Sequence, residues 1–134
     1  MFTEFPLPQK QTPFGLVSDP KIPLSVRTLA GYSTYRFLID TGADFSLAPR
    51  RLAQQLGLEW KTLPETRVMG IEQAGVMARL GLMSIRLQSI ELKVRTLFVD
   101  TRKPLFILGR ADFLDRFVLT IDQHQRKIIL TEIM

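Results

Sequence analysis

The chain has 134 residues, of which 46% are hydrophobic and 23% charged, and this composition is typical of one soluble globular domain with a single core. Its 18 basic and 13 acidic residues give a net charge of +5, but the Lys and Arg residues are scattered, without a glycine-rich phosphate loop or an aromatic RNA-binding motif. We therefore expect no nucleic-acid partner. The sequence contains no cysteine, which excludes disulfides, thiolate metal sites and a cysteine nucleophile.

The first 20 residues hold four of the eight prolines and show no sustained periodicity, which predicts an extended N-terminal arm ahead of a domain at residues 21–134. From residue 22 onward the pattern favours short strands separated by turns. Alternation at Ile22, Leu24 and Val26 indicates the first strand, and a turn at residues 30–31 leads to an apolar run ending at Ile39. Further strands are expected at residues 66–69, 76–87, 92–99, 105–108, 117–122 and 127–133.

Two short helices are expected among these strands. The first begins at Pro49, which suits a first helical position, and ends at Gly57, which suits a C-terminal cap. The second covers residues 111–116. The fold class predicted from these elements is all-β with two short helices.

Asp40 is the residue around which we build a chemical hypothesis. Peptide hydrolysis without a metal, serine or cysteine needs a base that activates water and an acid that protonates the leaving amine, and two carboxylates sharing one proton supply both. Asp40 ends the apolar run, and Gly42 allows the backbone to approach and donate N–H groups to a carboxylate. Taken alone, Asp40-Thr41-Gly42 also fits an ordinary β-turn.

Residues 37–44, FLIDTGAD, resemble the active-site strand and loop of the retropepsins, the retroviral-type aspartic proteases. Residues 105–110, LFILGR, resemble the second motif of that family, and the hairpin expected around residues 69–76 lies between the two motifs, where the family has its flap. The resemblance covers about residues 20–119. It implies a closed β-barrel, the acid-protease half fold, which acts as a two-fold homodimer and cleaves polypeptide substrates as an aspartic endopeptidase.

Matching position by position, the resemblance makes Asp40 the catalytic carboxylate, assigns the hydroxyl of Thr41 to the partner's loop, and assigns Gly42 to the substrate main chain. It implies that substrate-binding residues lie in the loop, the flap and the second motif: Ala43, Asp44, Leu47, Met69, Gly70, Ile71, Leu105 and Ile107. Gly109 and Arg110 would be structural, with Arg110 paired with Asp44 or a neighbouring carboxylate.

The oligomeric state follows from a count of motifs. The chain holds one Asp-Thr-Gly and no internal repeat, so a two-carboxylate site requires two copies. We expect the C-terminal hairpin, with residues 127–133 as an apolar edge strand, to supply the remaining dimer contact. The Pro-rich arm and this hairpin look more like the cellular, bacterial-type members of the clan than like the viral enzymes.

An alternative function stays open, because the expected flap has glycines only at its ends, Gly70 and Gly75, whereas viral flaps are rich in glycine. The alternative is a catalytically inactive dimerisation or peptide-binding module. His124, the sole histidine, has no second ligand near it in the sequence, so we expect no metal and no other cofactor. With no 20-residue apolar run and no signal-peptide pattern, we expect a cytoplasmic protein with no membrane partner.

Overall fold

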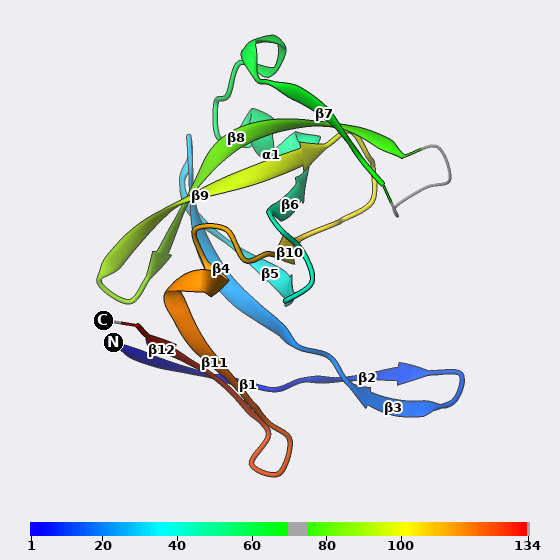
Figure 1. The fold of residues 1–134 in the computed structure, drawn as a ribbon, viewed down its shortest axis with the longest axis vertical. Helices are drawn as coiled ribbons and strands as arrows, with labels where there is room; N and C mark the ends of the chain where they lie inside the picture. The colour runs from blue at the N-terminus through cyan, green and yellow to red at the C-terminus, as the bar shows by residue number, and fades with distance from the viewer. Residues whose placement is uncertain (70–74, 134) are drawn as a thin grey trace.

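The computed structural model describes residues 1–69 and 75–133, and β-strands dominate its architecture (Figure 1). The helical elements are the α-helix α1 (Arg50–Gln55) and the 3₁₀ turns η1 (Trp60–Thr62) and η2 (Leu114–Arg116). The strands are β1 (Phe2–Pro6), β2 (Gln9–Thr12), β3 (Gly15–Ser18), β4 (Lys21–Thr28), β5 (Gly31–Ile39), β6 (Ser46–Pro49), β7 (Glu65–Val68), β8 (Val76–Leu87), β9 (Ile90–Val99), β10 (Ile107–Leu108), β11 (Phe117–Asp122) and β12 (Lys127–Glu132). The predicted all-β class is confirmed. In this described part of the chain, no helix is long and apolar enough to cross a membrane.

The largest sheet has seven strands in the order β4-β5-β10-β6-β9-β8-β7. The long strand β8 also pairs with β4, where Ser25 lies opposite Arg86 and Val26 opposite Ile85. This extra pairing closes the sheet on itself, as the expected barrel requires. Among residues 1–69 and 75–133, β7 is an edge strand that pairs with β8 alone.

The core fills the interior of this closed sheet. The alternating residues of β4, Ile22, Leu24 and Val26, are buried, with 0%, 2% and 0% of their surface exposed. The alternation read from the sequence therefore identifies the inward face correctly. Phe37 on β5 and Phe98 on β9 are fully buried, so the strand that leads to Asp40 is fixed by its packing.

A second, three-stranded sheet joins the two ends of the chain in the order β1-β12-β11 (Figure 1). The first 20 residues are thus partly strand: β1 pairs antiparallel with β12, and Leu7 is buried in the core. The expectation that residues 127–133 form an edge strand is wrong. β12 is the central strand, and both of its sides are hydrogen-bonded within the same chain. β2 and β3 form a separate hairpin that projects from the body.

The two expected helices differ in how well they form. α1 begins at Arg50, one residue later than expected, and Gly57 follows it with φ of +76°, a left-handed conformation that glycine adopts without strain. The second expected helix forms only in part: turns occupy residues 110–113, and the helical portion is the three-residue η2 that follows. Asp112 has φ of +66°, which a right-handed helix excludes, and its carboxylate accepts hydrogen bonds from the backbone N and the Nε of Arg95 at 3.0 and 2.8 Å.

Candidate active site

Asp40 lies directly after β5, at the point where the two sequence motifs come together. β10 runs parallel to β5, with Leu108 opposite Ile39, and the backbone N of Asp40 donates to the carbonyl of Leu108 at 3.0 Å. Residues far apart in the sequence are therefore joined by main-chain hydrogen bonds beside the carboxylate. The position of Asp40 is consequently set by the sheet rather than by a free loop.

The Asp40 carboxylate has a local hydrogen-bond partner. The backbone N–H of Gly42 donates to its Oδ1 at 2.9 Å, and a Cβ on Gly42 would lie only 3.3 Å from the same oxygen. The side chain of Asp40 is half-buried. Gly42 thus orients the carboxylate, and any larger residue there would crowd it.

Arg110 braces the loop that carries Asp40. Its backbone N donates to the carbonyl of Ala43 at 2.9 Å, and its Nη1 donates to the carbonyl of Thr41 at 2.6 Å. Its Nη2 forms an ion pair with Asp44, the partner named from the sequence, so this expected pairing is confirmed. Residue 110 therefore holds the loop at three points, and the two side-chain contacts, to Thr41 and Asp44, use the fork of the guanidinium, which a lysine lacks.

Gly109 allows the two segments to approach each other. A Cβ at this position would lie 2.4 Å from the carbonyl carbon of Phe45 and 2.8 Å from the backbone N of Ser46. The backbone N of Gly109 in turn donates to the Oγ of the buried Ser46 at 3.0 Å. Only glycine leaves room for this contact, so the residue has a steric role in shaping the loop.

A cleft of about 430 Å³ opens beside Asp40. Seven of the residues assigned from the sequence line it: Asp40, Gly42, Ala43, Asp44, Leu47, Met69 and Ile107. Thr41 is exposed and Leu105 packs in a nearby apolar cluster, and neither lines the cleft. Gly70 and Ile71 lie outside the described residues. The structure therefore brings most of the assigned loop and strand residues together around one hollow.

The family model described as aspartyl protease matches residues 24–111, about two thirds of the chain, and it spans both motifs and the cleft. The chain belongs to the aspartyl protease family.

Solved structures show which fold this family member has. A retropepsin-like aspartic protease from Rickettsia conorii superposes with a TM-score of 0.64 at 20% identity, covering 97% of this chain and 91% of that one. The retroviral protease-like domain of Ddi1 from Leishmania major superposes with a TM-score of 0.58 at 15% identity, covering 88% of this chain and 96% of that one. A search among curated proteins finds no significant sequence match. The fold of this aspartyl protease family member is thus retropepsin-like, as the motifs indicated.

Four residues that line the cleft of this family member were not identified from the sequence: Phe45, Arg67, Val68 and Leu97. Leu97 reaches the cleft because β9 runs parallel to β6, which puts it beside Leu47. The sequence around Leu97 does not indicate this pairing, because the two strands are far apart along the chain. Arg67 and Val68 precede Met69 in the strand that leads to the expected flap, so extending the flap assignment two residues backward would have included them.

The charges near the cleft limit the chemistry that one copy of this family member can perform. Two carboxylates line the cleft, and Asp44 is already paired with Arg110, whereas Asp40 forms no ion pair with residues 1–69 or 75–133. Those same residues hold no group of three or more His, Cys, Asp and Glu side chains arranged for a metal ion.

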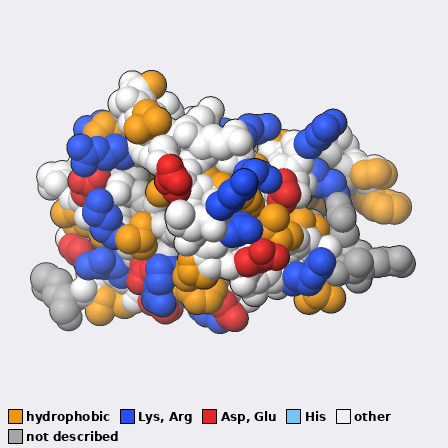
Figure 2. Space-filling view, turned by 90° about the horizontal axis from the view of Figure 1, so that it is seen from above, with side chains coloured by type: hydrophobic (Ala, Val, Ile, Leu, Met, Phe, Trp, Pro, Cys, Tyr) orange, Lys and Arg blue, Asp and Glu red, His pale blue; other side chains and the backbone are white. Residues whose placement is uncertain are grey.

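On the face drawn in Figure 2, basic side chains are interspersed with acidic and apolar ones. A surface that binds the phosphate backbone of a nucleic acid instead has a continuous patch of positive charge.

Proposed function

We propose that this protein is an aspartic endopeptidase that hydrolyses peptide bonds in extended polypeptides. The observation that carries the proposal is Asp40 itself: a carboxylate oriented by Gly42, braced through Arg110 and opening onto a cleft of about 430 Å³ in an aspartyl protease family member. Apolar walls from Leu47 and Ile107 suit hydrophobic side chains of a substrate.

The reaction needs two carboxylates, and the site supplies them as a homodimer. In each copy Asp40 is the cleft carboxylate without an ion-pair partner among the described residues, so a two-fold axis beside it brings a second Asp40 into position. With one proton shared between the pair, one oxygen accepts a proton from the attacking water while the other carboxyl donates to the scissile carbonyl. The proton taken from water then passes from the carboxyl to the leaving amine.

The residues around Asp40 take supporting roles in this proposal. The exposed Thr41 hydroxyl contacts the partner's equivalent loop, and Gly42 hydrogen-bonds the substrate main chain. β7 lines the cleft and is the edge strand of the large sheet, so it presents unpaired main-chain groups to an extended peptide. These features support a polypeptide substrate rather than a small molecule.

The test compares Asp40→Asn with wild type on an unstructured protein substrate and a peptide library. Asparagine is nearly isosteric but cannot act as the acid or base that a carboxyl group is, so the cleavage rate is expected to fall about 100-fold or more while the circular dichroism spectrum stays the same. Asp100→Asn is the matched control, because Asp100 also precedes a threonine but lies outside the cleft and pairs with Arg50 at 3.4 Å. Equal activity of Asp40→Asn and wild type would refute the proposal, and peptide binding without cleavage by wild type would identify a peptide-binding module instead.

A further inference from the structure

Arg67 places a positive charge on the wall of the cleft formed by β7. It is exposed, it lines the same hollow as Asp40, and it lies opposite Met77 in the pairing of β7 with β8. The guanidinium therefore belongs to a side chain that a bound substrate passes.

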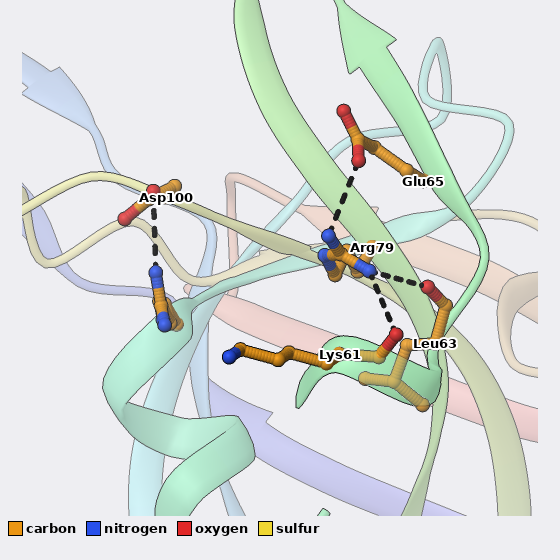
Figure 3. A network of polar contacts seen from close by, with 6 residues as sticks. Lys61, Leu63, Glu65, Arg79 and Asp100 are labelled. Carbon is orange, nitrogen blue, oxygen red and sulfur yellow. Dashed lines mark hydrogen bonds and ion pairs between the residues drawn. The ribbon is translucent and has the colours of Figure 1, made fainter. Parts of the chain in front are cut away.

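Apart from Asp40, the acidic groups nearest to Arg67 along β7 and across the cleft are paired with other arginines. Glu65, two residues earlier on β7, pairs with Arg79 at 3.2 Å, and Figure 3 draws the two side chains facing each other. Asp44 on the loop side pairs with Arg110. No carboxylate in residues 1–69 or 75–133 forms an ion pair with Arg67. Arg67 is thus the cleft cation whose charge the described residues leave without a counterion.

The start of β7 is held by Arg79, so the point of the backbone from which the Arg67 side chain extends is defined. Arg79 donates from Nη1 to the carbonyl of Leu63 at 2.9 Å and from Nη2 to Glu65, which ties β8 to the segment that leads into β7 (Figure 3). The guanidinium of Arg79 also lies 5.6 Å from the ring centroid of Trp60.

Besides Asp40 and Asp44, the cleft that Arg67 lines has apolar walls. Leu47, Leu97 and Ile107 line the same cleft, and Val68 follows Arg67 directly in β7. A substrate side chain that enters this wall from solvent therefore needs an aliphatic stem with an anionic tip, a description that glutamate fits. Expulsion of water by the bound peptide strengthens the attraction between that tip and the guanidinium.

We propose that Arg67 is a specificity-determining residue that makes the cleft prefer polypeptides with a glutamate near the scissile bond over those with a lysine there. This inference rests on the proposed protease function. Since a homodimer carries two copies of Arg67 related by the two-fold axis, the acidic preference appears at two substrate positions, one on each side of the cleaved bond.

The test uses one cleavable peptide in which each position in turn is Glu, Gln or Lys, assayed with wild type, Arg67→Gln and Arg67→Glu. At the responsive positions, wild type is expected to cleave the Glu peptide with a kcat/KM roughly tenfold above that of the Lys peptide. Arg67→Gln brings the ratio near one, and Arg67→Glu reverses it. Arg51→Glu on the exposed side of α1 is the control, since it changes the net charge equally outside the cleft and should leave the ratio at its wild-type value.

The outcomes separate this inference from the function on which it rests. Cleavage that depends on Asp40, combined with a Glu-to-Lys ratio unchanged in Arg67→Glu, overturns the role of Arg67 and leaves the protease intact. If wild type cleaves no peptide, the same series is measured by fluorescence anisotropy as binding. A Glu-over-Lys affinity ratio that reverses in Arg67→Glu then supports the role of Arg67, and an unchanged ratio overturns it.

Discussion

The backbone of Gly109 lies against the backbone of Phe45 so closely that a single methyl group does not fit between them. Phe45 belongs to the loop that carries Asp40, and Gly109 directly follows the strand that pairs beside it. The contact therefore joins the two motifs through main-chain atoms, which have little freedom to move aside.

Gly109→Ala is expected to lower the free energy of unfolding by about 3 kcal/mol, because its Cβ overlaps backbone rather than a flexible side chain. Peptide cleavage should fall with it, since the loop at Asp40 must shift. Urea unfolding and kcat measure the two effects. Gly109 does not have a positive φ, so backbone strain adds nothing to the loss and the overlap of the Cβ is its cause. A Gly109→Ala variant as stable and as active as wild type would contradict a steric role for Gly109.

Arg110→Lys is expected to reduce kcat/KM by roughly tenfold while changing stability by less than about 1 kcal/mol, because exposed ion pairs contribute little to folding. The Asp44 and Arg110 side chains are 78% and 41% exposed, so the pair holds loop geometry more than it holds the fold. Enzyme kinetics and chemical denaturation distinguish the two effects. Arg51→Lys on the exposed face of α1 is the control and should match wild type in both.

Asp112 predicts a pH dependence of stability. The Asp112 carboxyl has a pKa below its ordinary value, mainly because it accepts hydrogen bonds from the side chain of Arg95. When the pKa of a carboxyl is lower in the folded state than in the unfolded state, its charged form stabilises the folded protein. This stabilisation is complete at pH values above the pKa of the unfolded state, about 3.9, and is lost as the pH falls through the pKa of the folded state. The stability advantage of wild type over Asp112→Asn should therefore be full at about pH 6 and shrink below about pH 4.

Urea midpoints at about pH 6 and about pH 3 measure that difference. Asparagine also tolerates the positive φ of this position, so the substitution removes charge without adding backbone strain. Asp115→Asn, on the exposed side of the same segment, controls for the loss of one carboxylate. A wild-type advantage that stays constant across this acidic range would argue against the Arg95 contact as its source.

The proposed homodimer predicts that specific activity depends on concentration. Activity should fall on dilution below the dimer dissociation constant, because one copy supplies one Asp40. An excess of Asp40→Asn subunits should inhibit wild type through mixed dimers, given time for exchange. Sedimentation velocity measured at the same concentrations links the loss to dissociation. Specific activity that stays constant while the protein sediments as a monomer would refute a shared site.

The sequence predicts the parts of this fold that local patterns encode. The alternation along residues 76–87 predicts β8 with its correct bounds, and the two motifs predict that Asp40 and Arg110 belong to one site. Arg110 and Asp44 are 66 positions apart, and only the family resemblance connects them. Their ion pair was predictable for that reason alone.

The errors have physical causes that a local pattern does not contain. The pattern of residues 111–116 predicts a helix, but Asp112, whose carboxylate accepts hydrogen bonds from Arg95, has a left-handed backbone that restricts the helical part to the 3₁₀ turn after it. β12 was expected at an edge because its partner β1 comes from the opposite end of the chain. Leu97 in the cleft depends on the parallel register of β6 and β9, which is likewise a tertiary feature.

The pairing of β1 with β12 inside one chain separates subunit folding from subunit association. Each copy satisfies the hydrogen bonds of its own terminal strands, with the backbone N of Glu132 donating to the carbonyl of Met1 at 2.9 Å. No strand has to be exchanged between copies to complete this sheet. In the proposed homodimer, association is therefore an equilibrium between two subunits that are already folded, and a change of concentration shifts it without unfolding either subunit.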